Sequence, residues 1–270
     1  MDTIKKNLLN VYVINLKKDV YKKQKILKYL KTTMFSYKFI EATDAANLTT
    51  KDYKNYNDYL RKLFMGKSLI DKEIAIFNSH LSVLREIVAL NLPLALVLED
   101  DVSIPKIFEN TLNEIIKINY KWDLIRFIGP NKFSSFNGRK VLKINKTFSL
   151  QRFPKLPGGA HAYLISNNGA KKIIEQCKGY YLPFDILIGQ TWRRNINCLY
   201  LKPGLISQAT INNELMLMDP RLIKVPKKIN SIYFFSRATY KLYESFFKMM
   251  HYLIFFFPDK YAYFRSKHKQ

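Results

Sequence analysis

The chain has 270 residues, enough for one substantial domain with an appendage or for two small domains that share a cleft. Hydrophobic residues make up 48% of it, which excludes disorder as a general description. The formal net charge of +24, from 45 Lys and Arg against 21 Asp and Glu, favours an anionic partner: nucleic acid, anionic lipid or a phosphorylated glycan. An AT-rich coding sequence would also raise the Lys content, so charge alone does not choose among these partners.

Cysteine usage and hydropathy bear on the compartment. The two cysteines, Cys177 and Cys198, form no CxxC pair and have no metal-binding spacing, which fits a reducing cytosol. The N-terminal apolar run is short and lacks a small-residue cleavage site, and no stretch reaches the roughly 18 apolar residues of a transmembrane helix. We therefore expect a cytoplasmic protein that is soluble or peripherally attached to a membrane.

The first half of the chain alternates strand and helix patterns. An apolar strand is predicted over 8–16, followed by a Lys-rich helix over 19–33 and a short strand around Phe39 and Ile40. Residues 48–65 are polar and Tyr-rich, and predict a loop or irregular helices. The clearest helix covers 71–91, where apolar residues recur at spacings of three and four and Asp71 is expected to cap the start.

The second half of the chain continues the alternation of strand and helix patterns. We predict a central strand at 94–98, a crossover helix at 105–120, a strand at 123–129, a polar hairpin-like stretch at 131–152, a strand, turn and helix over 158–177, a further helix within 181–194 and a last strand at 197–206. This pattern is typical of an α/β fold. We assign residues 1–225 to one domain and 226–270 to a basic, amphipathic helical region.

Three adjacent carboxylates, Glu99, Asp100 and Asp101, follow the apolar strand in the stretch LVLEDDV. Ligands of open α/β sheets bind outside the carboxyl ends of the strands, which is where these side chains are expected. One interpretation is a helix cap with solvated loop charges. The other is a site for Mg²⁺ or Mn²⁺ that bridges the phosphates of a nucleotide, because the cation would relieve the repulsion among the carboxylates.

A polar stripe marks the C-terminal region. Polar residues recur at spacings of four, three, four and three, with apolar residues nearly everywhere else; they are Arg237, Lys241, Glu244, Lys248 and His251. Residues 221–270 hold 11 Lys and Arg against two acidic residues. The pattern fits either a helix that lies on an anionic membrane surface or a helix that packs on the domain.

Several motifs occur together in an order that is typical of one family. They are VYVINLKKD near the start, EIAIFNSHLSVLREI, LPLALVLEDDV, WDLIRF, GAHAYLISNNGAKKI and LPFDILI. On these motifs, which span about residues 10–210, the chain resembles glycosyltransferase family 25, the lipopolysaccharide or lipooligosaccharide glycosyltransferases that include bacterial β-galactosyltransferases.

The resemblance implies a GT-A-like, nucleotide-sugar-binding fold with a mixed sheet flanked by helices. Glu99, Asp100 and Asp101 would stand for the metal-binding DxD motif. Asp101 would be the direct ligand of Mn²⁺ or Mg²⁺, and Glu99 would lie nearer the ribose or a metal-bound water.

The resemblance also places residues beside the nucleotide of a UDP-sugar: Asn15, Leu16, Lys17, Lys18 and, near the base or ribose, Asp44. The chain departs from the family pattern here. The family commonly has Arg where Lys17 and Lys18 stand, and Gly-Glu-Ile-Gly-Cys where residues 72–76 read Lys-Glu-Ile-Ala-Ile. Lys keeps the charge but loses the bidentate fork of Arg, so the detailed contacts at these positions would differ from those of the family.

Sugar transfer also needs a base that deprotonates the acceptor hydroxyl. Asp185, in the LPFDIL segment, is the candidate, and its alternative is a helix cap after Pro183. Candidate substrate contacts are His80, His161 and Gln190, although His80 fits a buried structural role equally well.

The predicted function is metal-dependent transfer of galactose from UDP-galactose, with inversion to a β-linkage, onto a lipopolysaccharide or lipooligosaccharide core saccharide. The predicted location is the inner face of the cytoplasmic membrane, which the C-terminal region would contact. A non-catalytic relative and a nucleic-acid-binding protein with a metal site remain as alternatives. We expect no nucleic-acid partner, because the sequence has no RNP, zinc-finger or helix-turn-helix pattern and its basic residues are scattered.

Overall fold

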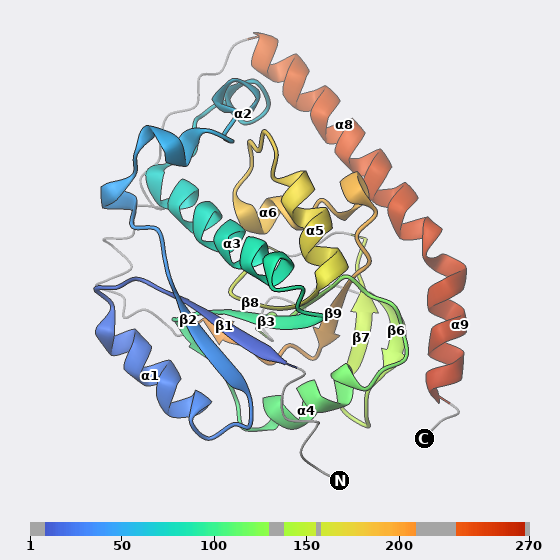
Figure 1. Cartoon of the computed structure of the whole chain (residues 1–270). Helices are drawn as coiled ribbons and strands as arrows, with labels where there is room; N and C mark the ends of the chain where they lie inside the picture. Colours follow the sequence, from blue (N-terminus) through green and yellow to red (C-terminus); the bar gives the residue numbers. More distant parts are fainter. Residues whose placement is uncertain (1–8, 130–137, 155–157, 209–230, 268–270) are drawn as a thin grey trace.

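A computed structural model describes residues 9–129, 138–154, 158–208 and 231–267. Its centre is an eight-stranded mixed sheet of strand order β2-β1-β3-β8-β5-β9-β7-β6 (Figure 1). The strands are β1 (Asn10–Asn15), β2 (Ser36–Glu41), β3 (Leu94–Glu99), β5 (Leu124–Arg126), β6 (Arg139–Lys143), β7 (Ser149–Arg152), β8 (Ala162–Ser166) and β9 (Cys198–Lys202). Two further short strands, β4 (Val102–Ser103) and β10 (Ser207–Gln208), pair with each other.

Helices cover both faces of this sheet (Figure 1). On one side lie α3 (Asp71–Ala89), α5 (Asn167–Gln176) and α6 (Phe184–Leu187), and on the other lie α1 (Val20–Leu30) and α4 (Ile107–Ile116). The remaining helices are α2 (Asp58–Met65), α8 (Ser231–Ile254), α9 (Phe256–Lys267) and the 3₁₀ turns η2 (Ala45–Asn47), η3 (Thr50–Tyr53) and η5 (Thr191–Arg194). The predicted fold class, a mixed sheet flanked by helices, is confirmed.

Strand direction sets up one functional edge. β1 pairs in parallel with β2 and with β3, so the carboxyl ends of these three strands lie together. β8 runs antiparallel to β3 and begins at the same edge, where Leu98 faces Ala162. The loops that follow Asn15, Glu41 and Glu99 therefore converge at the position where open α/β sheets bind ligands.

Two details differ from the sequence-based prediction of helix ends. Asp71 does not cap α3: its carboxylate accepts a hydrogen bond from the Tyr53 hydroxyl, while Glu73 accepts from the backbone N–H of Ile70. No turn separates β8 from α5, because Ser166 caps the helix directly by accepting from the N–H of Gly169. A β-carbon at Gly169 would overlap the carbonyl oxygen of Asp123, so close packing rather than turn geometry explains this glycine.

The C-terminal helices pack along one flank of the molecule (Figure 1). α8 lies against α2 and η5, and α9 lies against β6. Most of the predicted polar stripe faces the domain: Arg237 donates to the carbonyl of Phe64, and His251 is buried beside Thr191. Only Lys241 of the stripe is exposed. The predicted domain boundary at 225/226 lies outside the described residues.

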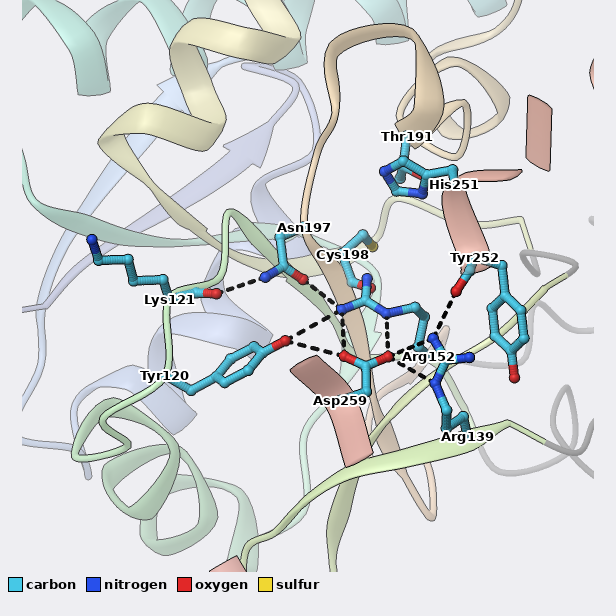
Figure 2. A network of polar contacts seen from close by, with 10 residues as sticks. All are labelled: Tyr120, Lys121, Arg139, Arg152, Thr191, Asn197, Cys198, His251, Tyr252 and Asp259. Atoms are coloured by element: carbon cyan, nitrogen blue, oxygen red, sulfur yellow. Dashed lines mark hydrogen bonds and ion pairs between the residues drawn. The ribbon is translucent and has the colours of Figure 1, made fainter. Parts of the chain in front are cut away.

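An ion-pair network fastens α9 to the sheet (Figure 2). Asp259 is fully buried, and its carboxylate accepts from Arg139 at 2.6 Å and from Arg152 at 2.8 Å. The Tyr120 hydroxyl donates to the same carboxylate at 3.1 Å. Two cations and one hydroxyl therefore satisfy a charge that would otherwise be costly to bury.

Candidate functional site

A cavity of about 370 Å³ lies at the carboxyl ends of β1, β2 and β3. Its lining includes half of the twelve residues that the sequence singles out: Leu16, Asp44, His80, Glu99, Asp100 and Asp101. They come from four segments of the chain: the carboxyl ends of β1, β2 and β3 with the loops that follow them, and the neighbouring helix α3. We call this space the donor cavity, after the UDP-sugar that is expected there from the sequence.

The carboxylates that follow β3 repel one another in the donor cavity. Burial raises the pKa of Asp101 to about 6, and the charges of Glu99 and Asp100 add to the shift. Burial also raises the pKa of Asp100, although the hydrogen bond from Asn15 and the charge of Lys22 oppose this. The site thus holds excess negative charge at neutral pH, which a bound cation would relieve.

Asn15 is a positioning residue at the end of β1. Its amide donates to Asp100 Oδ2 at 2.6 Å and to the backbone carbonyl of Asp19 at 3.2 Å. Lys22, on α1, lies 3.0 Å from Asp19 and 3.7 Å from Asp100. These contacts tie the loop after β1 to the carboxylates after β3. Asn15 was predicted to lie beside the nucleotide, but it does not line the cavity itself.

His80 combines a structural role with a place in the cavity lining. It is 1% exposed, and its ring stacks on Phe184 with the centroids 4.4 Å apart. Nε2 lies 3.2 Å from Glu99 Oε1, and Nδ1 lies 3.2 Å from the Tyr163 hydroxyl. The imidazole therefore fixes the orientation of Glu99.

The carboxylates do not make a complete metal site by themselves. Within the described parts of the chain, no three carboxylate, imidazole or thiol groups converge on a point where they could hold a metal ion. Asp101 Oδ1 is nevertheless buried with no hydrogen-bond partner among the described residues. Mg²⁺ is commonly bound by one or two carboxylates together with substrate phosphates, so this oxygen fits a cation that shares its ligands with a diphosphate.

Of the predicted nucleotide contacts Asp44, Lys17 and Lys18, only Asp44 lines the donor cavity. Asp44 lines the cavity, caps η2 through the N–H of Ala46 and accepts from Lys18 at 2.7 Å. The Lys18 hydrogen bond is the main cause that lowers the pKa of Asp44. Lys17 is exposed and does not line the cavity.

Asp185 and Gln190 lie in a second cavity of about 220 Å³, which also includes Gly158, Glu244 and Lys248. Asp185 is not the N-cap of α6, since Pro183 holds that position; its carboxylate accepts from the N–H groups of Ile186 and Gly159. Gln190 is buried and donates to the Tyr240 hydroxyl at 2.5 Å. We call this space the α8 cavity.

His161 and Gln208 are linked by the loop before β10. His161 is buried, its ring nitrogen Nε2 lies 3.1 Å from the carbonyl of Ile206, and its own carbonyl accepts from the N–H of Glu99. That loop leads into β10, whose last residue, Gln208, lines the donor cavity and lies 3.5 Å from Asp101 Oδ2. His161 lines neither of the two cavities, but its carbonyl holds the backbone of Glu99 in the wall of the donor cavity.

Sequence reasoning missed several residues of the donor cavity, among them Asp19, Lys22, Thr43, Lys72, Ser79 and Gln208. Ser79 accepts from the N–H of Thr43 and so fixes the loop after β2. Its position directly before His80 on the buried side of α3 was the available signal. No local pattern marks Gln208, because the pairing of β10 with β4 brings it to the site.

A sequence model of one family matches residues 8–188, and its description is glycosyltransferase family 25, an LPS biosynthesis protein. The chain belongs to glycosyltransferase family 25. The matched range contains every residue of the donor cavity except Gln208. The predicted family is therefore confirmed.

Curated relatives of this family 25 chain include proteins named as galactosyltransferases and proteins named as inactive. Procollagen galactosyltransferase 2 of Mus musculus is 28% identical over 174 residues, which cover 61% of this chain and 27% of the relative. A probable inactive glycosyltransferase 25 family member 3 of Rattus norvegicus is 26% identical over 204 residues, which cover 70% of this chain and 34% of the relative. The chain spans about a quarter to a third of the length of these relatives.

Among solved structures, the family 25 chain is similar to a glycosyltransferase involved in glycosylation of the major capsid of PBCV-1. The TM-score is 0.42 at 10% identity, and the match covers 78% of this chain and 98% of that one.

Proposed function

We propose that this chain is an active glycosyltransferase that transfers galactose from UDP-galactose, with inversion, to a lipopolysaccharide or lipooligosaccharide core saccharide. The observation that carries the proposal is the donor cavity, where Asp44, Glu99, Asp100 and Asp101 meet at the carboxyl ends of three parallel strands. Family membership supports the reaction class.

The donor and the acceptor have separate support. The similarity to procollagen galactosyltransferase 2 of the mouse favours a galactosyl donor. The description of the family as LPS biosynthesis proteins and the net charge of +24 favour an anionic glycan as the acceptor.

The proposed cofactor is Mn²⁺ or Mg²⁺, which when bound would stabilise the departing diphosphate. Asp101 would hold the cation through its buried oxygen Oδ1. Glu99, fixed by His80, would face the ribose or a metal-bound water. Asn15 and Lys22 hold Asp100 so that the loop keeps its shape when the donor binds.

Asp185 is the proposed base for the acceptor hydroxyl. It belongs to the α8 cavity, and the adjacent residue Phe184 packs on His80 of the donor cavity. An acceptor in the α8 cavity would thus lie next to the wall that separates the two spaces. Two backbone N–H groups, of Gly159 and Ile186, donate to this carboxylate and hold it in position.

The variant Asp185→Asn tests this assignment. Because the amide cannot accept the proton, kcat is expected to fall by about 100-fold or more. UDP binding, measured by thermal shift, is expected to stay unchanged because Asp185 does not line the donor cavity. Glu175→Gln, at an exposed ion pair on α5, is the control. Wild-type turnover in Asp185→Asn would remove Asp185 from the mechanism.

A non-catalytic role is the second candidate, because similar family members in rat, mouse and human are named inactive. A panel of nucleotide sugars with Mn²⁺, assayed for nucleotide release with and without a lipooligosaccharide acceptor, separates the two. We expect acceptor-stimulated release from UDP-galactose. Absence of turnover with every donor, in a protein that still binds UDP, would favour the non-catalytic role.

A further inference from the structure

The C-terminal helix α8 is amphipathic, but its polar side packs on the domain. Ser236 donates to the carbonyl of Leu63 at 2.6 Å, and Arg237 donates to that of Phe64 at 3.3 Å. Farther along α8, the hydroxyl of Tyr240 accepts a hydrogen bond from the side-chain amide of Gln190. A helix on the surface of a water-soluble domain normally buries its apolar side instead.

The apolar sides of α8 and α9 consequently face outward. Of the 24 exposed large apolar side chains in the described chain, 15 lie on these two helices. The most exposed include Phe257 at 80%, Phe235 at 75% and Leu242 at 72%. Leu242 and Phe246 follow Phe235 at spacings of seven and four, so the three form one row along α8. A concentration of this kind marks an interaction surface rather than ordinary scattered exposure.

The charges on this flank have one sign. Within 231–267, the exposed charged side chains are all basic: Lys241, Lys260, Arg265 and Lys267. The two acids in this range, Glu244 and Asp259, are turned toward the domain and are ion-paired. The outward surface therefore combines apolar side chains with cations.

We propose that the outward side of α8 and α9 lies in the interface of an anionic lipid bilayer. No described helix has the length and hydropathy needed to cross a membrane. The 24 residues of α8 form a helix about 36 Å long, and its apolar side runs along this length. Helices with an apolar side and basic flanks settle in the plane of the headgroups. A second copy of the chain suits the surface less well, because it would place the same cations against one another in a molecule of net charge +24.

Membrane docking would also orient the α8 cavity. Glu244 and Lys248 of α8 line that cavity beside Asp185, on the side of the helix away from the proposed lipid contact. The cavity would then open close to the bilayer surface, where a lipid-borne saccharide is available. This consequence rests on the proposed function, whereas the docking itself does not.

Flotation of the full chain with lipid vesicles tests the docking. One set of vesicles contains phosphatidylglycerol and phosphatidylcholine, and the other contains phosphatidylcholine alone. The test variant changes the row on α8: Phe235→Ser, Leu242→Ser and Phe246→Ser. The matched control changes three exposed apolar residues elsewhere: Met34→Ser, Leu90→Ser and Ile107→Ser. Melting temperatures and sedimentation velocity report the fold and the oligomeric state.

We expect wild type and control to bind anionic vesicles equally, and the α8 variant to bind at least about ten-fold more weakly. Binding should weaken on neutral vesicles and at high salt. The α8 variant should melt like wild type, since these side chains do not pack on the domain. If the triple variant unfolds, the single variant Leu242→Ser replaces it in the flotation test, with a smaller expected loss of vesicle binding. Equal binding by all variants, no binding by wild type, or a wild-type dimer that the α8 changes dissociate would overturn the proposal. Enzyme activity does not enter any of these readouts.

Discussion

Asp101→Asn is expected to lower the rate of sugar transfer by at least about 100-fold and, at the same time, to raise the melting temperature. The activity falls because the amide is a poor ligand for the cation that would stabilise the diphosphate. The stability rises because the carboxylate is buried beside Glu99 and Asp100, which raises its pKa to about 6. Removing this charge should add about 1 to 2 kcal/mol, or roughly 2 to 8 °C.

The opposite signs distinguish this account from a purely structural role of Asp101. Replacing a capping carboxylate would cost stability, replacing a solvated one would change stability little, and neither change would alter activity. Glu175→Gln removes one negative charge at the exposed pair with Lys178 and should change both quantities little. Near-normal transfer by Asp101→Asn, measured with saturating UDP-galactose and Mn²⁺, would show that the residue is not part of the site.

Among the single substitutions proposed for this chain, Asp259→Asn is expected to cause the largest loss of stability. The change leaves the buried guanidinium groups of Arg139 and Arg152 without their counter-charge (Figure 2). Removal of one partner from a buried ion pair costs about 3 to 5 kcal/mol, which corresponds to a fall in melting temperature of roughly 6 °C or more. Hydrogen exchange should increase first in α9, which this network holds on β6.

Glu244→Gln is the matched comparison for this result. It removes a negative charge from the same C-terminal region, but the pair of Glu244 with Lys248 is partly exposed. Such pairs contribute about 1 kcal/mol or less. If Asp259→Asn melts no earlier than Glu244→Gln, the buried network does not fasten α9 as the structure indicates.

The site was predictable where strand ends and acidic residues coincide. A buried apolar strand followed by Glu99, Asp100 and Asp101 has few structural uses, and the structure places all three in one cavity. The helix pattern of α3 likewise placed His80 next to the buried side. Local sequence was sufficient in these cases, because hydrophobic periodicity fixes both the element and its buried face.

Long-range pairing limited the remaining predictions. Gln208 reaches the donor cavity only through the pairing of β10 with β4, and no pattern in the sequence indicated that Asp185 would lie in a cavity lined by α8. The polar stripe of α8 was recognised, yet a hydrophobic pattern does not say which side of a helix packs on the domain. The side that packs is set by buried polar partners such as Thr191 and Gln190, and no local pattern shows that these two residues contact α8.

Calorimetric titration of UDP into the wild-type chain, with Mn²⁺ or with EDTA, tests the central claim most directly. The claim is that the carboxylates after β3 form a site for a nucleotide diphosphate and a divalent cation. We expect saturable binding with one UDP per chain in Mn²⁺, and at least about ten-fold weaker binding in EDTA or in Asp101→Asn. Binding that is equally tight with and without the metal and in both proteins would contradict the account.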